Sequence, residues 1–182
     1  IDPQLKLPVF KPAVLLGKSA PSTGISYVTG QPIITSTASE KKGDLYRFRA
    51  NVHPLFKTSQ FSAPVRLAVP ESIHTEPGNI RQNQWKLVDF DGDGALDVSV
   101  GIDFWGDFGA LNGGEGAFDD SGRWTRGPLR GYVYFLRNTG STEKPVYAAP
   151  ARVMAAGKPV DPYGMPSPSW GDFDGDGDLD LL

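Results

Sequence analysis

The sequence predicts an all-β fold assembled from repeated units of four antiparallel strands. Three observations support this prediction. Gly and Pro, with 22 and 16 copies among 182 residues, supply turns at a frequency typical of many short strands. A nine-residue segment rich in aspartate occurs twice, beginning at Asp89 and at Asp172. After the first copy, Val98, Ser99 and Val100 alternate between apolar and polar as a strand does.

The repeats define the boundaries of the unit. Residues 169–180 repeat residues 85–97, and residues 147–153 repeat residues 61–67 at a similar offset. A third unit is expected to begin near Pro168. The strands predicted from these repeats are 25–29, 32–37, 44–50 and 61–68 in a first unit, and 84–88, 97–100, 131–137 and 146–154 in a second.

Four-stranded units that repeat along a chain are the blades of a β-propeller. Because a propeller needs four to eight blades, we expect the N-terminal portion of a larger ring, for which seven blades is one option, continuing beyond Leu182. A two-sheet β-sandwich remains the alternative. The expected parts are an N-terminal strand within 1–24 that completes the last blade, a blade without a metal loop at 25–72, a blade with a metal loop and a long insertion at 84–160, and the start of the next blade at 168–182.

The two aspartate-rich loops have the composition of calcium sites. Aspartates occupy loop positions 1, 3, 5 and 9, and the intervening glycines permit the positive-φ turns that wrapping around an ion requires. Carboxylates are the hard oxygen ligands that Ca²⁺ prefers, whereas Zn²⁺ prefers His or Cys. An EF-hand is excluded, because position 12 of the first loop is Val100 and not Glu. With the backbone carbonyls at position 7 included, the expected ligands are Asp89, Asp91, Asp93, Ala95 and Asp97 in one site, and Asp172, Asp174, Asp176, Asp178 and Asp180 in the other.

The motif Asp-Phe-Asp-Gly-Asp-Gly-x-Leu-Asp, followed by a short apolar strand, resembles the FG-GAP/VCBS repeat, the blade unit of integrin-like propellers. Segments 134–140 and 145–147 also resemble such blades, and the resemblance covers about residues 40–182. It implies that the loop carboxylates bind Ca²⁺, that the first unit binds no metal, and that the protein is secreted, periplasmic or on the cell surface. It does not fix an activity, because such propellers occur in adhesins, lectin-like modules and polysaccharide-degrading enzymes.

A second candidate site is expected on the face opposite the metal loops. Three long connections, 70–84, 102–130 and 156–168, would share that face, and long loops on a rigid scaffold often carry binding residues. Their aromatic rings are suited to stacking on sugars, and their arginines to binding carboxylates. The expected substrate-binding residues are Asp103, Trp105, Asp107, Trp124, Arg126 and Asp161, and the candidate catalytic residues are His74, Tyr163 and Arg130.

These residues leave three functions open. One is a carbohydrate-active enzyme, such as a lyase in which an Arg neutralises a uronate carboxylate and Tyr163 or His74 removes the C5 proton. Another is a non-catalytic module that binds carbohydrate or protein, or mediates adhesion. The third is a purely structural propeller, in which Trp105 and Trp124 only pin the long loop. The expected partners are an anionic polysaccharide and the remainder of the same protein, C-terminal to Leu182.

Composition and charge exclude several other classes of protein. The formal charge is −3, and nine of the 21 acidic residues lie in the two loops, so the rest of the chain is mildly basic. The absence of Cys excludes disulfides. No apolar run approaches the roughly 18 residues of a membrane span, so no membrane insertion is expected. No basic cluster indicates nucleic-acid binding.

Overall fold

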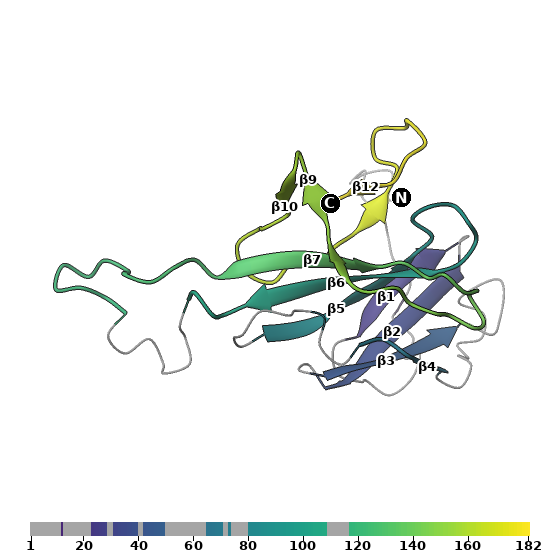
Figure 1. Cartoon of the computed structure of the whole chain (residues 1–182), viewed down its shortest axis with the longest axis horizontal. Coiled ribbons are helices and arrows are strands. Elements are labelled where there is room, and N and C mark those ends of the chain that lie inside the picture. The colour runs from purple at the N-terminus through teal and green to yellow at the C-terminus, as the bar shows by residue number, and fades with distance from the viewer. Residues whose placement is uncertain are drawn as a thin grey trace.

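The computed structural model describes residues 12, 23–28, 31–39, 42–49, 65–70, 73, 80–108 and 117–182. These residues form antiparallel β-sheets joined by turns and loops, and none of them is helical (Figure 1). The all-β prediction is therefore confirmed for the described part of the chain. No described segment forms a helix that could cross a membrane.

The first sheet corresponds to the first predicted unit. Its strands pair in the order β1-β2-β3-β4, all antiparallel. Residues 61–64, where the fourth strand was expected to begin, lie outside the described residues, as does the N-terminal strand expected within 1–24. The strands are β1 (Gly24–Val28), β2 (Gln31–Ser39), β3 (Lys42–Arg49) and β4 (Val65–Leu67).

The second sheet corresponds to the second unit and has the same order, β5-β6-β7-β8. Val98, Val100 and Ile102 give β6 the β-branched side chains that pack well on a pleated surface, and β6 is buried along its whole length. A strand buried on both faces needs a layer on each side. The strands are β5 (Ile80–Val88), β6 (Asp97–Phe104), β7 (Arg130–Leu136) and β8 (Ala151–Arg152).

Two of these strands are longer than predicted. β5 begins at Ile80 and not at residue 84, because a bulge between Gln82 and Gln84 interrupts the alternation that marks a strand in sequence. β6 continues past Val100, because it pairs with β7 as far as Phe104. The connection between β6 and β7, which we call the arm, therefore spans residues 105–129, and Figure 1 shows its described part 117–129 reaching away from the sheets.

The prediction of one continuous fourth strand at 146–154 is wrong. Only β8 pairs with β7, and Tyr147 adds an isolated bridge to Asn138. Pro150 has no N–H to donate to a neighbouring strand and separates these two contacts. The chain then forms a small separate hairpin of β9 (Met154–Ala155) and β10 (Lys158–Pro159).

The third unit is represented by a two-stranded hairpin. β11 (Trp170–Gly171) and β12 (Asp180–Leu181) pair antiparallel and enclose the second aspartate-rich loop. Hydrogen bonds between Ser169 and Leu182 extend this pairing by one residue at the open end, with N···O distances of 3.0 and 2.9 Å. β11 begins at Trp170, close to Pro168, where the repeats predict that the third unit begins.

One face of the second sheet packs on the first sheet. β5 contacts β1 and β2, and the register places Trp85 beside Val100. Two hydrogen bonds join the sheets: the Thr35 hydroxyl donates to the Trp85 carbonyl over 3.0 Å, and the Leu87 N–H donates to the Ser26 hydroxyl over 2.9 Å. The shared core comprises Ile33, Leu67, Ile73, Trp85, Leu87, Leu96, Val98, Val100, Ile102, Phe104, Tyr132, Tyr134 and Leu136.

The opposite face of the second sheet carries glycines where the chain crosses it. A Cβ on Gly101 would lie 1.8 Å from the Pro166 carbonyl oxygen, and one on Gly131 would lie 2.4 Å from the Gly164 carbonyl oxygen. The backbone of residues 162–168 therefore lies directly on β6 and β7 on its way to β11. Further along this face, the Trp170 ring contacts Phe90, with ring centroids 5.1 Å apart.

The second sheet thus lies between two layers, the first sheet and the segment that leads into β11 and β12. A cavity of about 430 Å³ is bordered by residues of β1 and β5 and by Ser169, Trp170 and Leu179. The first strands of three successive units therefore face one space. Within the described residues the units do not close into a ring.

Candidate metal centre

The first aspartate-rich loop joins two paired antiparallel strands. β5 ends at Val88, β6 begins at Asp97, and these two residues pair with each other. Gly92 and Gly94 have φ values of 72° and 85°, a region that residues with a Cβ rarely adopt. The two glycines let the chain wrap into a tight loop, and paired strands on both sides rule out the two flanking helices of an EF-hand.

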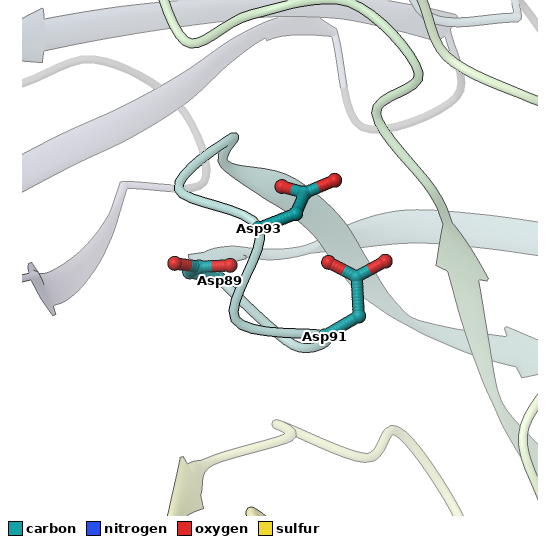
Figure 2. Close-up of side chains that lie close together, drawn as sticks. All are labelled: Asp89, Asp91 and Asp93. Carbon is teal, nitrogen blue, oxygen red and sulfur yellow. The ribbon is translucent and has the colours of Figure 1, made fainter.

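Three carboxylates of this loop gather at one place. Asp89, Asp91 and Asp93 each offer an oxygen, and these oxygens lie within 4.8 Å of one another. Figure 2 shows the three side chains together on the loop between β5 and β6. Because Ca²⁺ binds oxygens at 2.3–2.6 Å, ligands on opposite sides of one ion lie about 5 Å apart. The spacing of these oxygens fits one Ca²⁺.

The hydrogen bonding of Asp89 also fits a cation. Its Oδ2 accepts a hydrogen bond from the Gly94 N–H over 3.1 Å. Its Oδ1 is buried and has no hydrogen-bond partner within the described part of the chain. A buried carboxylate oxygen without a partner is costly, and a metal ion would supply the missing interaction.

Asp97, at loop position 9, is the most buried aspartate of this loop, with 1% of its surface exposed. Its Oδ2 accepts from the Phe90 N–H over 3.1 Å, and its Oδ1 accepts from the Asn138 N–H over 2.6 Å. The pKa of Asp97 is raised above its ordinary value, mainly by burial; the two hydrogen bonds lower it, and the charges of Asp91 and Asp93 also raise it. Asp97 therefore closes the loop through backbone contacts, and its role as a metal ligand stays a prediction.

The second loop folds like the first. Gly175 and Gly177 have φ values of 83° and 96°, at the positions of Gly92 and Gly94. Asp172, Asp174 and Asp176 form a second triad of oxygens within 4.8 Å of one another. Two independent copies of the sequence therefore produce the same arrangement of carboxylates.

Three hydrogen bonds also recur between the copies. Gly177 donates to Asp172 as Gly94 does to Asp89, and Phe173 donates to Asp180 as Phe90 does to Asp97. The N–H of Asp178 donates to Asp176 as that of Ala95 does to Asp93. Ala95 and Asp178 thus lie at matching places in the closing turn, and coordination by their carbonyl oxygens stays a prediction.

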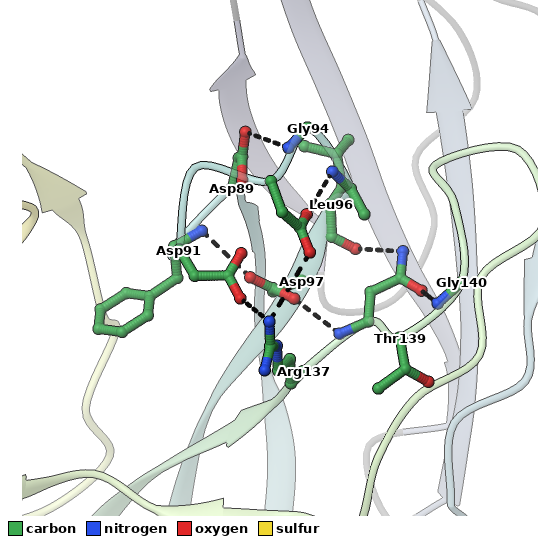
Figure 3. Close-up of polar contacts among 12 residues, drawn as sticks. Asp89, Asp91, Gly94, Leu96, Asp97, Arg137, Thr139 and Gly140 are labelled. Carbon is green, nitrogen blue, oxygen red and sulfur yellow. Dashed lines mark hydrogen bonds and ion pairs between the residues drawn. The ribbon is translucent and has the colours of Figure 1, made fainter.

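A neighbouring hairpin supports the first loop. The Thr142 hydroxyl donates to the Gly94 carbonyl over 3.0 Å and accepts from the Leu96 N–H over 3.1 Å. The Asn138 side chain, which is fully buried, donates to the Leu96 carbonyl over 3.2 Å. Arg137 forms an ion pair with Asp91 (Figure 3). Sequence reasoning missed these three roles. The resemblance of segment 134–140 to other blades was a signal for Arg137 and Asn138 but not for Thr142.

At the other end of the second sheet, several predicted binding residues meet. Arg130 donates from Nε to Asp107 over 2.8 Å and from Nη1 to Asp161. These two carboxylates raise the pKa of Arg130 above its ordinary value, so it stays charged. Tyr163 forms a backbone bridge with Arg130, and its side chain is exposed. The structure brings these four residues together from the arm, β7 and the connection to β11.

Asp103 lies in a different place from the one predicted. It belongs to β6 and not to the arm, and its side chain is 0% exposed. Its Oδ2 accepts from the Arg81 Nη2 over 2.6 Å and from the Trp105 Nε1 over 2.8 Å. This buried carboxylate therefore holds Arg81 and Trp105 in position, and its role in substrate binding stays a prediction.

The arm carries a cluster of aromatic rings. Phe108 stacks on Trp124 with centroids 4.5 Å apart, and Trp105 and Phe118 pack edge-on against these two rings. The Trp124 Nε1 donates to the Gly127 carbonyl over 3.2 Å. Arg126 is partly buried in the same connection, and His74 lies outside the described residues.

Comparison with protein-family models, with curated proteins and with solved structures finds no match for this chain. The repeated loops and the residues around them therefore carry the functional argument.

Proposed function

We propose that this chain binds two Ca²⁺ ions, one in each aspartate-rich loop, and that the ions stabilise successive blades of an FG-GAP/VCBS-type β-propeller. The observation that carries the proposal is the duplication of the site. Two loops 83 positions apart gather three carboxylates each, with the same glycine conformations and the same three hydrogen bonds. A turn that needed no ion would have no reason to keep three carboxylates together in both copies, because like charges repel.

The stacking of the sheets supports a propeller over a two-sheet sandwich. A sandwich has two sheets with one core between them. Here the second sheet is covered on its other face by the 162–168 segment and Trp170, and β6 is buried on both faces. The first strands of three units also border one cavity, as the inner strands of blades do around a central channel. A secreted, periplasmic or cell-surface location, where Ca²⁺ is plentiful, is part of this proposal.

Metal binding can be tested by titrating the metal-free full-length chain with Tb³⁺, a luminescent substitute for Ca²⁺. Trp170 lies two residues before Asp172 and contacts Phe90 in the first loop, so it can sensitise Tb³⁺ near both loops. We expect two sites in the wild type, one after Asp89→Asn/Asp93→Asn, one after Asp172→Asn/Asp176→Asn, and none in the quadruple variant. Asp119→Asn/Asp120→Asn, which removes two exposed carboxylates elsewhere, should retain both sites. Equal binding by the wild type and the quadruple variant would refute the proposal.

We propose a second function, carbohydrate binding at the base of the arm. The supporting observation is that the aromatic cluster of Trp105, Phe108 and Trp124 adjoins the Asp107–Arg130–Asp161 ion pairs, because Gly127 contacts both Trp124 and Asp107. Rings beside charged hydrogen-bonding groups suit the two kinds of surface on a sugar. Arg130 is already paired with two carboxylates, which favours binding over the lyase role, since it has less charge to offer a uronate.

Glycan-array binding of the Ca²⁺-loaded chain tests this second function. We expect Trp124→Ala to abolish binding of every glycan that the wild type binds. Phe173→Ala removes an exposed ring outside the arm and should bind the same glycans as the wild type. Ultraviolet absorbance of unsaturated uronates, measured with a panel of uronate polymers, would reveal lyase activity. An array without any binding would refute the carbohydrate proposal and leave the metal proposal intact.

A further inference from the structure

Arg137 lies at the rim of the first metal loop. It follows β7, and both of its neighbours, Leu136 and Asn138, are fully buried, so its backbone is held in place. Its Nη2 lies 2.6 Å from Asp91 Oδ2 and 3.9 Å from Asp93 Oδ2, as drawn in Figure 3. The Arg137 side chain is 58% exposed, so it can move away without breaking the core.

The two metal loops therefore differ in charge. The first loop has four aspartates, and Arg137 places one positive charge beside two of them. The second loop has five aspartates, from Asp172 to Asp180, and no Lys or Arg among the described residues forms an ion pair with any of them. Within the described residues, one copy of the site thus has a paired arginine and the other copy has none.

We propose that Arg137 is an internal counter-ion that weakens Ca²⁺ binding at the first loop and holds this loop together when Ca²⁺ is scarce. The inference rests on the calcium-binding function proposed above. The guanidinium occupies one oxygen of Asp91, and a positive charge this close to a second cation opposes its binding. The same charge relieves the repulsion among the carboxylates of the metal-free loop.

The test reads each loop separately in the full-length chain. The Asp172→Asn/Asp176→Asn background reports the first loop alone, and Asp89→Asn/Asp93→Asn reports the second. Ca²⁺ affinity is measured by competition against bound Tb³⁺. In the first background we expect Arg137→Gln to increase Ca²⁺ affinity about tenfold at low salt, and less at high salt because Arg137 is largely exposed. In the second background Arg137→Gln should change nothing. Arg123→Gln, an equal charge change at an exposed site in the arm, should change neither loop.

A second measurement separates a counter-ion from an ordinary structural residue. With a chelator present, Arg137→Gln should lower the thermal midpoint, because the carboxylates lose their counter-ion. With saturating Ca²⁺, the variant should match or exceed the wild type. A purely structural role would lower the midpoint equally in both conditions and would overturn the inference, as would unchanged or reduced Ca²⁺ affinity in Arg137→Gln. If neither loop binds Ca²⁺ in any background, the proposed function itself fails, and this inference fails with it.

Discussion

At the scale of single residues, Asn138 joins the metal loop to the neighbouring hairpin. Its side-chain amide donates to the carbonyls of Leu96 and Ser141, and its side-chain oxygen accepts from the N–H groups of Gly140 and Val146. The backbone N–H of Asn138 also donates a hydrogen bond to Asp97. This one buried residue therefore satisfies hydrogen-bonding groups of both the metal loop and the neighbouring hairpin. No residue of similar size offers two donors and an acceptor in the same plane.

Asn138→Ala should destabilise the protein by about 3 kcal/mol, because it leaves several buried backbone groups without partners. Urea denaturation monitored by Trp fluorescence measures the loss. Thr139→Ala is the matched control, since the Thr139 hydroxyl makes one exposed hydrogen bond to Val146 and should contribute less than about 1 kcal/mol. Equal losses in the two variants would show that Asn138 does not have this central role.

Which residues could be predicted depended on how local their roles are. The triads of both loops follow from spacing alone, since a turn of nine residues brings alternate carboxylates together whatever surrounds it. The role of Asp103 could not be predicted, because it depends on Arg81, 22 positions away, being brought beside it across β5 and β6. Asn138 and Arg137 were missed for the same reason, since their partners in the metal loop lie more than 40 positions earlier in the chain.

At the scale of elements, the crossing of residues 162–168 over the second sheet depends on two positions without side chains. Gly101 and Gly131 face neighbouring backbone at distances shorter than any real Cβ contact. Sequence showed glycines in both strands, but a glycine in a strand has several explanations. Only the packing identifies these two as the place where the chain passes from one unit to the next.

Gly101→Ala should destabilise the protein by about 3 kcal/mol, because its Cβ would lie 1.8 Å from the Pro166 carbonyl oxygen and the connection must shift. Ser99→Ala, two residues earlier on the same buried face, is the control. The Ser99 hydroxyl has no hydrogen-bond partner in the described part of the chain, so its loss should be nearly neutral. Chemical denaturation of both variants gives the comparison, and a neutral Gly101→Ala would contradict the packing.

The turn at the outer part of the arm should respond to acid. The Ser121 hydroxyl, and then the Arg123 N–H, lower the pKa of Asp119 below its ordinary value of 3.8. Since the folded-state pKa lies below the unfolded one, the carboxylate stabilises the turn above about pH 4, and this stabilisation disappears as the pH falls through the folded-state pKa. NMR shifts of the Ser121 and Arg123 amides should follow this titration. Asp119→Asn should abolish it, and a titration that persists in this variant would assign it to another group.

At the scale of the whole molecule, two ions between paired strands should make stability depend on Ca²⁺. At a free concentration about 100 times Kd, each site adds about 2.7 kcal/mol to the free energy of unfolding. We therefore expect the thermal midpoint to rise with Ca²⁺ in the wild type and fall on adding chelator. The variant lacking both triads should be insensitive to either addition, and an equal response from it would place the effect elsewhere.

The order of the repeated units could be predicted from the sequence, but the outer strands of their sheets could be predicted less well. Repeats located both four-stranded sheets and the third hairpin, because the aspartate-rich segment recurs in the second and third units and the outer-strand segment in the first and second. The outer strand of the second unit was misjudged, since pairing at an edge is decided by which N–H groups remain available around Pro150.

The space bordered by β1, β5 and β11 has a consequence for assembly. In the proposed ring, each added unit would turn its own first strand toward the same axis, so the bore widens with every repeat. Ser26, Lys86 and Ser169 border it together with Val28, Leu87 and Leu179, so a channel formed by such strands would have walls of mixed polarity.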